Sequence, residues 1–103
     1  MEMHQFITIL RPTRIQMITD RPSELEEKTV SLHYNYLKEL VSKGIVHLAG
    51  LTQTNDETTF GIVIFFAADI AEARSLAEND PAVKKGVMNA EVYPFRIALP
   101  VSH

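Results

Sequence analysis

Residues 58–67 of this chain read TTFGIVIFFA, and this stretch decides the fold. It is rich in β-branched and aromatic residues and predicts a strand. Alternate residues point to opposite faces, and both faces of this strand are apolar. A strand with one wet face shows regular alternation of apolar and polar residues. We therefore expect the sheet that contains this strand to be covered on both sides.

Three other segments have the composition of strands. Residues 5–10 place Ile7 and Ile9 on one face of a first strand. Residues 45–52 are apolar and β-branched, and the turn-forming residues 54–57 join them to the 58–67 strand as a hairpin. Residues 89–99 predict the last strand.

The first helix has a clear start and a clear end. Ser23 is followed three residues later by Glu26, which is the spacing of a capping box. An apolar stripe then continues over residues 24–43, and Gly44 stands where a left-handed C-terminal cap is expected.

A second helix is predicted between the hairpin and the last strand. Asp69 and Glu72 repeat the capping-box spacing, and an apolar stripe runs to Asn79. Asp80 and Pro81 then open one short helical turn. The predicted order is βαββαβ, which is the ferredoxin-like α+β arrangement with a four-stranded antiparallel sheet, in one domain over residues 1–103.

Two helices can cover only one face of such a sheet. The second face of the 58–67 strand then needs another cover, and a second copy of the sheet is the economical one for a chain this short. We therefore expect a homodimer, with a small ligand or the chain termini as the alternative cover.

Composition excludes several classes of function. The chain has no cysteine, which suits a reducing compartment such as the cytoplasm. A net charge of -3 provides no positive electrostatic field that would attract nucleic acid. No apolar run is long enough to span a membrane. The histidines lack metal-ligand spacing and the glycines form no phosphate-binding loop, so we expect neither a metal nor a nucleotide cofactor.

His33 is the first candidate catalytic residue. It lies four residues before Leu37 and seven before Leu40, on or beside the apolar stripe of the first helix. Imidazole titrates near neutral pH and can act as a general base. The alternative is a core histidine bonded to a backbone carbonyl.

Asp80 is the second candidate, although its position already has a structural explanation. An aspartate before Pro81 is well placed to cap the free amides of the following turn. One carboxylate oxygen can cap while the other holds an imidazole ring, so capping and catalysis are compatible.

Two further residues are candidates for substrate contact. Arg11 ends the first strand and enters a predicted loop over residues 12–22, where it could bind an anionic group through a bidentate contact. A surface ion pair is the alternative for Arg11. Tyr36 is predicted to be a core aromatic that can also line a pocket.

Several short motifs occur together in an order and spacing that resemble the YCII-related (YciI-like) family. They are a helix that carries His33, a following strand with Ala49 and Gly50, the run from Asn79 to Val87, and the ending Val92-Tyr93-Pro94-Phe95. The resemblance covers nearly the whole chain. Residues 13–21 depart from it, because this loop is longer than in the commoner members.

The resemblance implies a dimeric α+β barrel with a pocket between helix and sheet. It implies His33 and Asp80 as the active-site pair, and Gly50 is a further candidate substrate contact. The better understood members of the family act on ring compounds as lyases or dehydrochlorinases. Our leading hypothesis is therefore a cofactor-independent lyase or isomerase for a small, cyclic and anionic substrate. The alternative is a non-catalytic binding or accessory module of the same fold.

Overall fold

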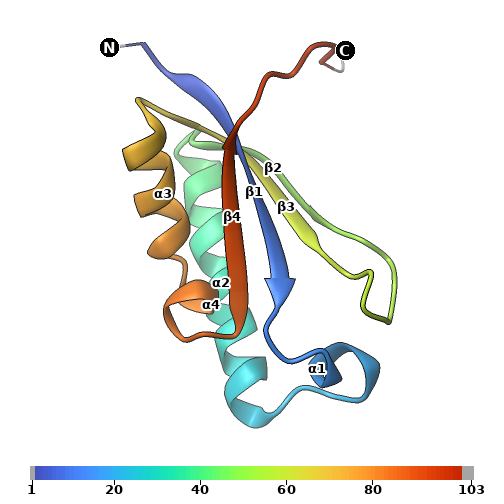
Figure 1. Ribbon diagram of the computed structural model, residues 1–103. Coiled ribbons are helices and arrows are strands. Elements are labelled where there is room, and N and C mark those ends of the chain that lie inside the picture. Colours follow the sequence, from blue (N-terminus) through green and yellow to red (C-terminus); the bar gives the residue numbers. More distant parts are fainter. Residues whose placement is uncertain (1, 101–103) are drawn as a thin grey trace.

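The computed structural model describes residues 2–100. The elements are β1 (His4–Pro12), α1 (Gln16–Thr19), α2 (Glu24–Ser42), β2 (Val46–Leu51), β3 (Gly61–Ala67), α3 (Ile70–Glu78), α4 (Pro81–Lys84) and β4 (Met88–Pro94). The strands form one antiparallel sheet in the order β2-β3-β1-β4. Figure 1 shows α2 and α3 on the same side of this sheet. This is the predicted ferredoxin-like α+β arrangement.

The core lies between the helices and one face of the sheet. Phe6 of β1 pairs with Phe65 of β3, and their rings are 6.0 Å apart between centroids. Both residues pack in one cluster with Leu40 of α2 and Ala73 of α3. Burial of this apolar surface fixes the helices on the sheet.

The ends of α2 follow the sequence signals closely. The Glu26 amide donates to Ser23 Oγ over 3.2 Å and the Ser23 amide donates to Glu26 Oε1 over 2.7 Å, so the capping box is confirmed. The helix ends at Ser42, and Gly44 has a φ of 75°, as a left-handed cap requires. Within residues 2–100, no helix has the length and apolar character of a membrane span.

Three segments differ most from the sequence predictions. The predicted loop over residues 12–22 contains the short helix α1, which buries Met17. The hairpin strand begins only at Gly61, because Asp56 Oδ1 accepts hydrogen bonds from Thr58 and holds residues 56–58 in a turn. The last strand ends at Pro94, although the Phe95 amide still donates to the Gln5 carbonyl over 3.0 Å.

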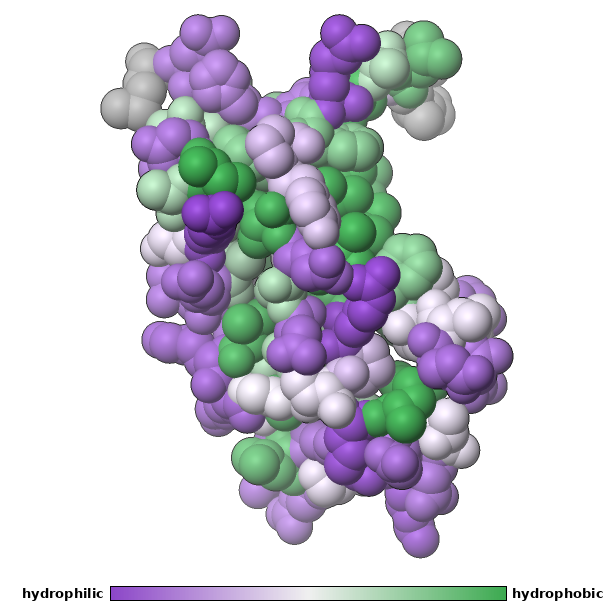
Figure 2. Space-filling view, viewed as in Figure 1, coloured by the Kyte–Doolittle hydropathy of each residue, from purple (hydrophilic) through white to green (hydrophobic). Residues whose placement is uncertain are grey.

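The face of the sheet opposite the helices is apolar along its centre. We call it the open face. In the strand register Ile7 pairs with Ile64 and Ile9 pairs with Ile62, so four isoleucines lie together there. Leu48 of β2 also pairs with Ile64 and is 42% exposed. Figure 2 shows hydrophobic side chains gathered over the sheet to the right of β4.

Candidate functional site

The ring of His33 lies against the carboxylate of Asp80. Its Nδ1 is 2.6 Å from Asp80 Oδ2 and 2.8 Å from Oδ1, although the residues are 47 positions apart in the chain. The carboxylate can only accept when it is ionised, so Nδ1 carries the proton in this hydrogen bond. The neutral ring therefore has its lone pair on Nε2.

Asp80 is held from a second direction by the turn that it caps. Its Oδ1 accepts a hydrogen bond of 2.9 Å from the Ala82 amide at the start of α4. Only 4% of the Asp80 side chain is exposed, against 14% for His33. A buried carboxylate needs such partners, because removal from water destabilises its charge. Asp80 thus combines the structural role with the contact to His33.

His33 lines a cavity of about 600 Å³ between α2 and the sheet. Its walls are predominantly apolar and include Leu37 of α2, Leu10 of β1 and Val63 of β3. Cavities of this size and polarity are typical of small-molecule sites. The ring nitrogen that Asp80 does not bind is therefore the one available to a molecule in the cavity.

The segment around α1 forms one wall of this cavity through Pro12, Met17 and Ile18. Arg14 fastens the segment to α2, because its Nε donates to Glu26 Oε2 over 2.9 Å and its Nη2 donates to Oε1. Sequence analysis missed this wall. The available signal was the three apolar residues Ile15, Met17 and Ile18 in a segment that is mostly polar.

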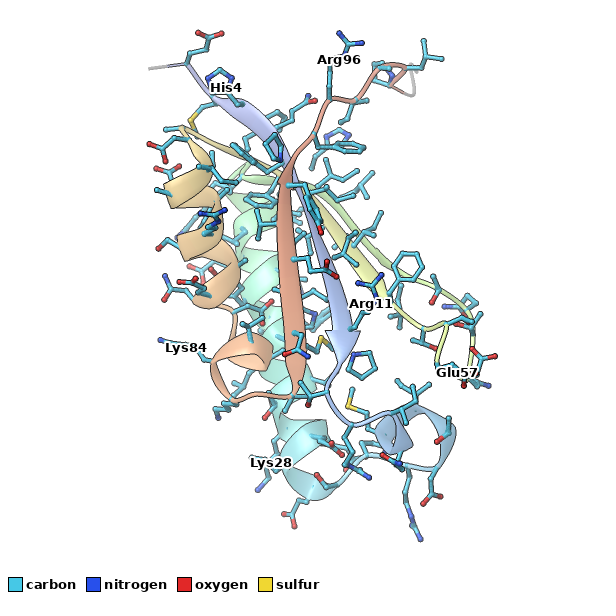
Figure 3. The ribbon with its side chains drawn as sticks, in the orientation of Figure 1. His4, Arg11, Lys28, Glu57, Lys84 and Arg96 are labelled. Atoms are coloured by element: carbon cyan, nitrogen blue, oxygen red, sulfur yellow. The ribbon has the colours of Figure 1, made fainter. Side chains whose placement is uncertain are left out.

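Arg11 lies away from the cavity. It alternates with the buried Leu10 along β1, and Figure 3 shows it on the side of the sheet away from the helices. Its guanidinium pairs with Glu91 and lies 5.9 Å from the centroid of the Phe60 ring. The structure therefore does not bring Arg11 together with His33 and Asp80 within one chain.

Tyr36 also lies outside the cavity wall, whereas Gly50 forms part of it. The Tyr36 hydroxyl donates to the Leu76 carbonyl over 2.7 Å and ties α2 to α3. Burial, and then the negative charge of Asp80, raise the pKa of Tyr36. Nothing lies within 4 Å of the position that a Cβ on Gly50 would take, so β2 leaves space at this point.

The residues 2–100 contain no group of three histidine, aspartate or glutamate side chains that could hold a metal ion. The polar side chains that do line the cavity are few, namely His33, Tyr34, Lys38 and Thr59. Lys38 was not singled out from the sequence. Its position four residues after Tyr34 places it on the same side of α2, so the helical period could have indicated it.

Fold and site together define a small α+β domain with a histidine–carboxylate pair at the wall of an apolar cavity. The chain belongs to the YCII-related domain family, whose profile matches residues 14–96. This confirms the resemblance seen in the sequence. No curated protein matches the chain.

A solved structure with a similar fold is 5-chloro-2-hydroxyhydroquinone dehydrochlorinase from Burkholderia phenoliruptrix AC1100, in complex with 2,5-dihydroxybenzoquinone. The two chains superpose with a TM-score of 0.63 and are 23% identical, over 88% of this chain and 93% of the dehydrochlorinase. At this identity the likeness establishes a shared fold.

The Arg14–Glu26 contact predicts how stability depends on pH. The hydrogen bond from Arg14, and then that from the Ser23 amide, lower the pKa of Glu26 to about 2. Ionised Glu26 therefore stabilises the folded chain above the unfolded pKa of about 4.3, and this stabilisation is lost as the pH falls towards about 2. Glu26→Gln should lower the melting temperature at pH 7, and the difference from the wild type should vanish near pH 2.

Thermal melts between pH 2 and pH 7 test this prediction. Glu27→Gln is the matched control, because Glu27 is an exposed neighbour on the same helical turn. A constant difference between Glu26→Gln and the wild type across this range would contradict the account of the Arg14 contact.

Proposed function

We propose that this protein is a small-molecule lyase or isomerase in which His33 acts as a general base. The observation that supports this most is that His33, a residue of the cavity wall, is bonded to Asp80 through Nδ1 of its ring. Asp80 would hold the tautomer whose Nε2 accepts a proton, and it would stabilise the imidazolium that forms.

The supported chemistry is proton removal from a small ring compound. A proton taken by Nε2 from a ring hydroxyl leaves its electron pair on the substrate, and this pair can expel a leaving group as an anion. In the dehydrochlorinase of similar fold the name specifies loss of hydrogen chloride from a chlorinated hydroxyhydroquinone. An elimination of this type needs no external oxidant, because the substrate loses only a proton and an anion. Chlorinated hydroxyhydroquinones are therefore the first substrates to assay.

The substitution His33→Gln tests the proposed role of His33 as a general base. Glutamine keeps a polar side chain that can reach Asp80, but it cannot take a proton near neutral pH. His33→Gln should lower kcat by about 10²- to 10⁴-fold on any substrate found in a screen of chlorinated hydroxyhydroquinones, phenols and ring acids. The melting temperature should stay within a few degrees of the wild-type value.

His4→Gln is the control for this experiment, because His4 lies at the far end of β1 from α1 (Figure 3). It should leave kcat unchanged. Unchanged turnover in His33→Gln would refute the general-base role. A large loss of melting temperature with intact ligand binding would instead favour a non-catalytic binding module in which His33 and Asp80 are structural.

We also propose that two copies of the chain pack through their open faces. The helices cover only the other side of the sheet. On the open face Ile7, Ile9 and Ile62 are half-buried, Leu48 is 42% exposed and Ile64 is buried, and together they form an apolar area. Sheets pack face to face about 10 Å apart, and a two-fold axis lets the same area cover itself.

Sedimentation equilibrium at micromolar concentration should give twice the chain mass of 11.6 kDa. Leu48→Lys, on the open face, should shift the protein towards monomer because it would place a charge in the interface. Leu32→Lys on α2 is the matched control, since Leu32 is 45% exposed and Leu48 is 42% exposed. A wild-type monomer, or equal behaviour of the two variants, would contradict the face-to-face dimer.

A further inference from the structure

We propose that Lys38 binds the negatively charged group of the molecule that occupies the cavity. The preferred ligands are then ring compounds with one anionic substituent, held with this substituent at the cavity mouth. The proposal rests on the small-molecule function proposed above. It assigns the anion to Lys38, and it leaves Arg11 outside the site.

The charges of the cavity wall support this assignment. Among the described residues that line the cavity, Lys38 is the one with a permanent charge, and no aspartate or glutamate joins it there. Asp80 reaches the site only through the ring of His33. An anionic ligand in the cavity would meet no negative charge in the wall and one positive charge, that of Lys38.

Several other cations of the chain already have partners. Arg11 pairs with Glu91 and Arg14 pairs with Glu26. On α2, Lys28 pairs with Glu24 over 3.3 Å and Lys43 pairs with Glu39 over 3.2 Å. Within the part of the chain that the structure describes, Lys38 makes no ion pair. Its charge is therefore available to a ligand.

The position of Lys38 sets how a ligand would lie. It follows His33 by five residues on α2, which is about 7.5 Å along the helix axis at a rise of about 1.5 Å per residue. Lys38 is exposed, and Tyr34 and Leu51, which line the same cavity, are 65% and 60% exposed. Lys38 thus lies at the open side of the cavity, whereas His33 is largely buried.

This arrangement separates the two ends of a ligand by polarity. A charged substituent stays hydrated beside Lys38 at the mouth, while the ring replaces water against the apolar wall. The reacting hydroxyl then faces His33 from the opposite side of the same ring. The lysine stem can pack along the ring, since its methylene groups are apolar.

Binding of two matched probes tests the proposal. 2,5-Dihydroxybenzoate is an anion at pH 7, and 2,5-dihydroxybenzamide is its neutral counterpart of nearly the same shape. Calorimetric titration at low ionic strength should show that the wild type prefers the anion by about tenfold, the size of a charge-assisted hydrogen bond. Lys38→Gln should lose this preference and keep its affinity for the amide, while Lys38→Arg should retain the preference.

Lys28→Gln and Arg11→Gln are the controls, and both should keep the wild-type preference. A preference that persists in Lys38→Gln, or that disappears in Arg11→Gln, would overturn the assignment. So would equal wild-type affinity for the two probes. The outcome is separate from that of the proposed reaction, because His33→Gln should lose turnover and still prefer the anion.

Discussion

The carboxylate of Asp80 joins two parts of the molecule that the chain forms far apart. It caps α4 through the Ala82 amide and binds Nδ1 of His33 on α2. Because the side chain is almost fully buried, either partner alone would leave charge poorly compensated. The contact therefore fixes the start of α4 against the middle of α2, and it sets which nitrogen of His33 remains free. The proposed chemistry and the proposed ligand orientation both depend on this one contact.

The two faces of the sheet differ, because one packs against the helices and the other does not. On the helix side, Phe6, Phe65 and Leu40 fill the core, and the cavity that His33 lines lies between α2 and the sheet. The α1 segment closes that opening on one side and is anchored there by Arg14 and Glu26. The apolar side chains of the open face are the reason why we propose that this face mediates self-association.

Local signals in the sequence were sufficient to predict most of the helices and strands. The Ser23–Glu26 box and Gly44 mark the ends of α2 because caps depend on a few neighbouring residues. The apolar faces of β3 likewise predict a sheet with two covered sides. The helix α1 in the loop before α2 was harder to predict, because it spans only Gln16–Thr19 and is held by tertiary contacts.

The candidate site was only partly accessible to the same reasoning. The stripe of α2 placed His33 near the core, and the turn at Pro81 explained Asp80, but their contact is a tertiary one that no local pattern specifies. Arg11 shows the limit most clearly. Its place at the end of β1 indicated a substrate contact, whereas strand alternation directs it to the open face, where Glu91 pairs with it.

The most direct measurement of the central claim is long-range ¹H–¹⁵N correlation of the His33 ring. We expect the neutral ring to carry its proton on Nδ1, to lose this preference in Asp80→Asn, and to shift at Nε2 when 2,5-dihydroxybenzoate is added. A neutral ring protonated on Nε2, or identical ring spectra in the wild type and Asp80→Asn, would contradict the account.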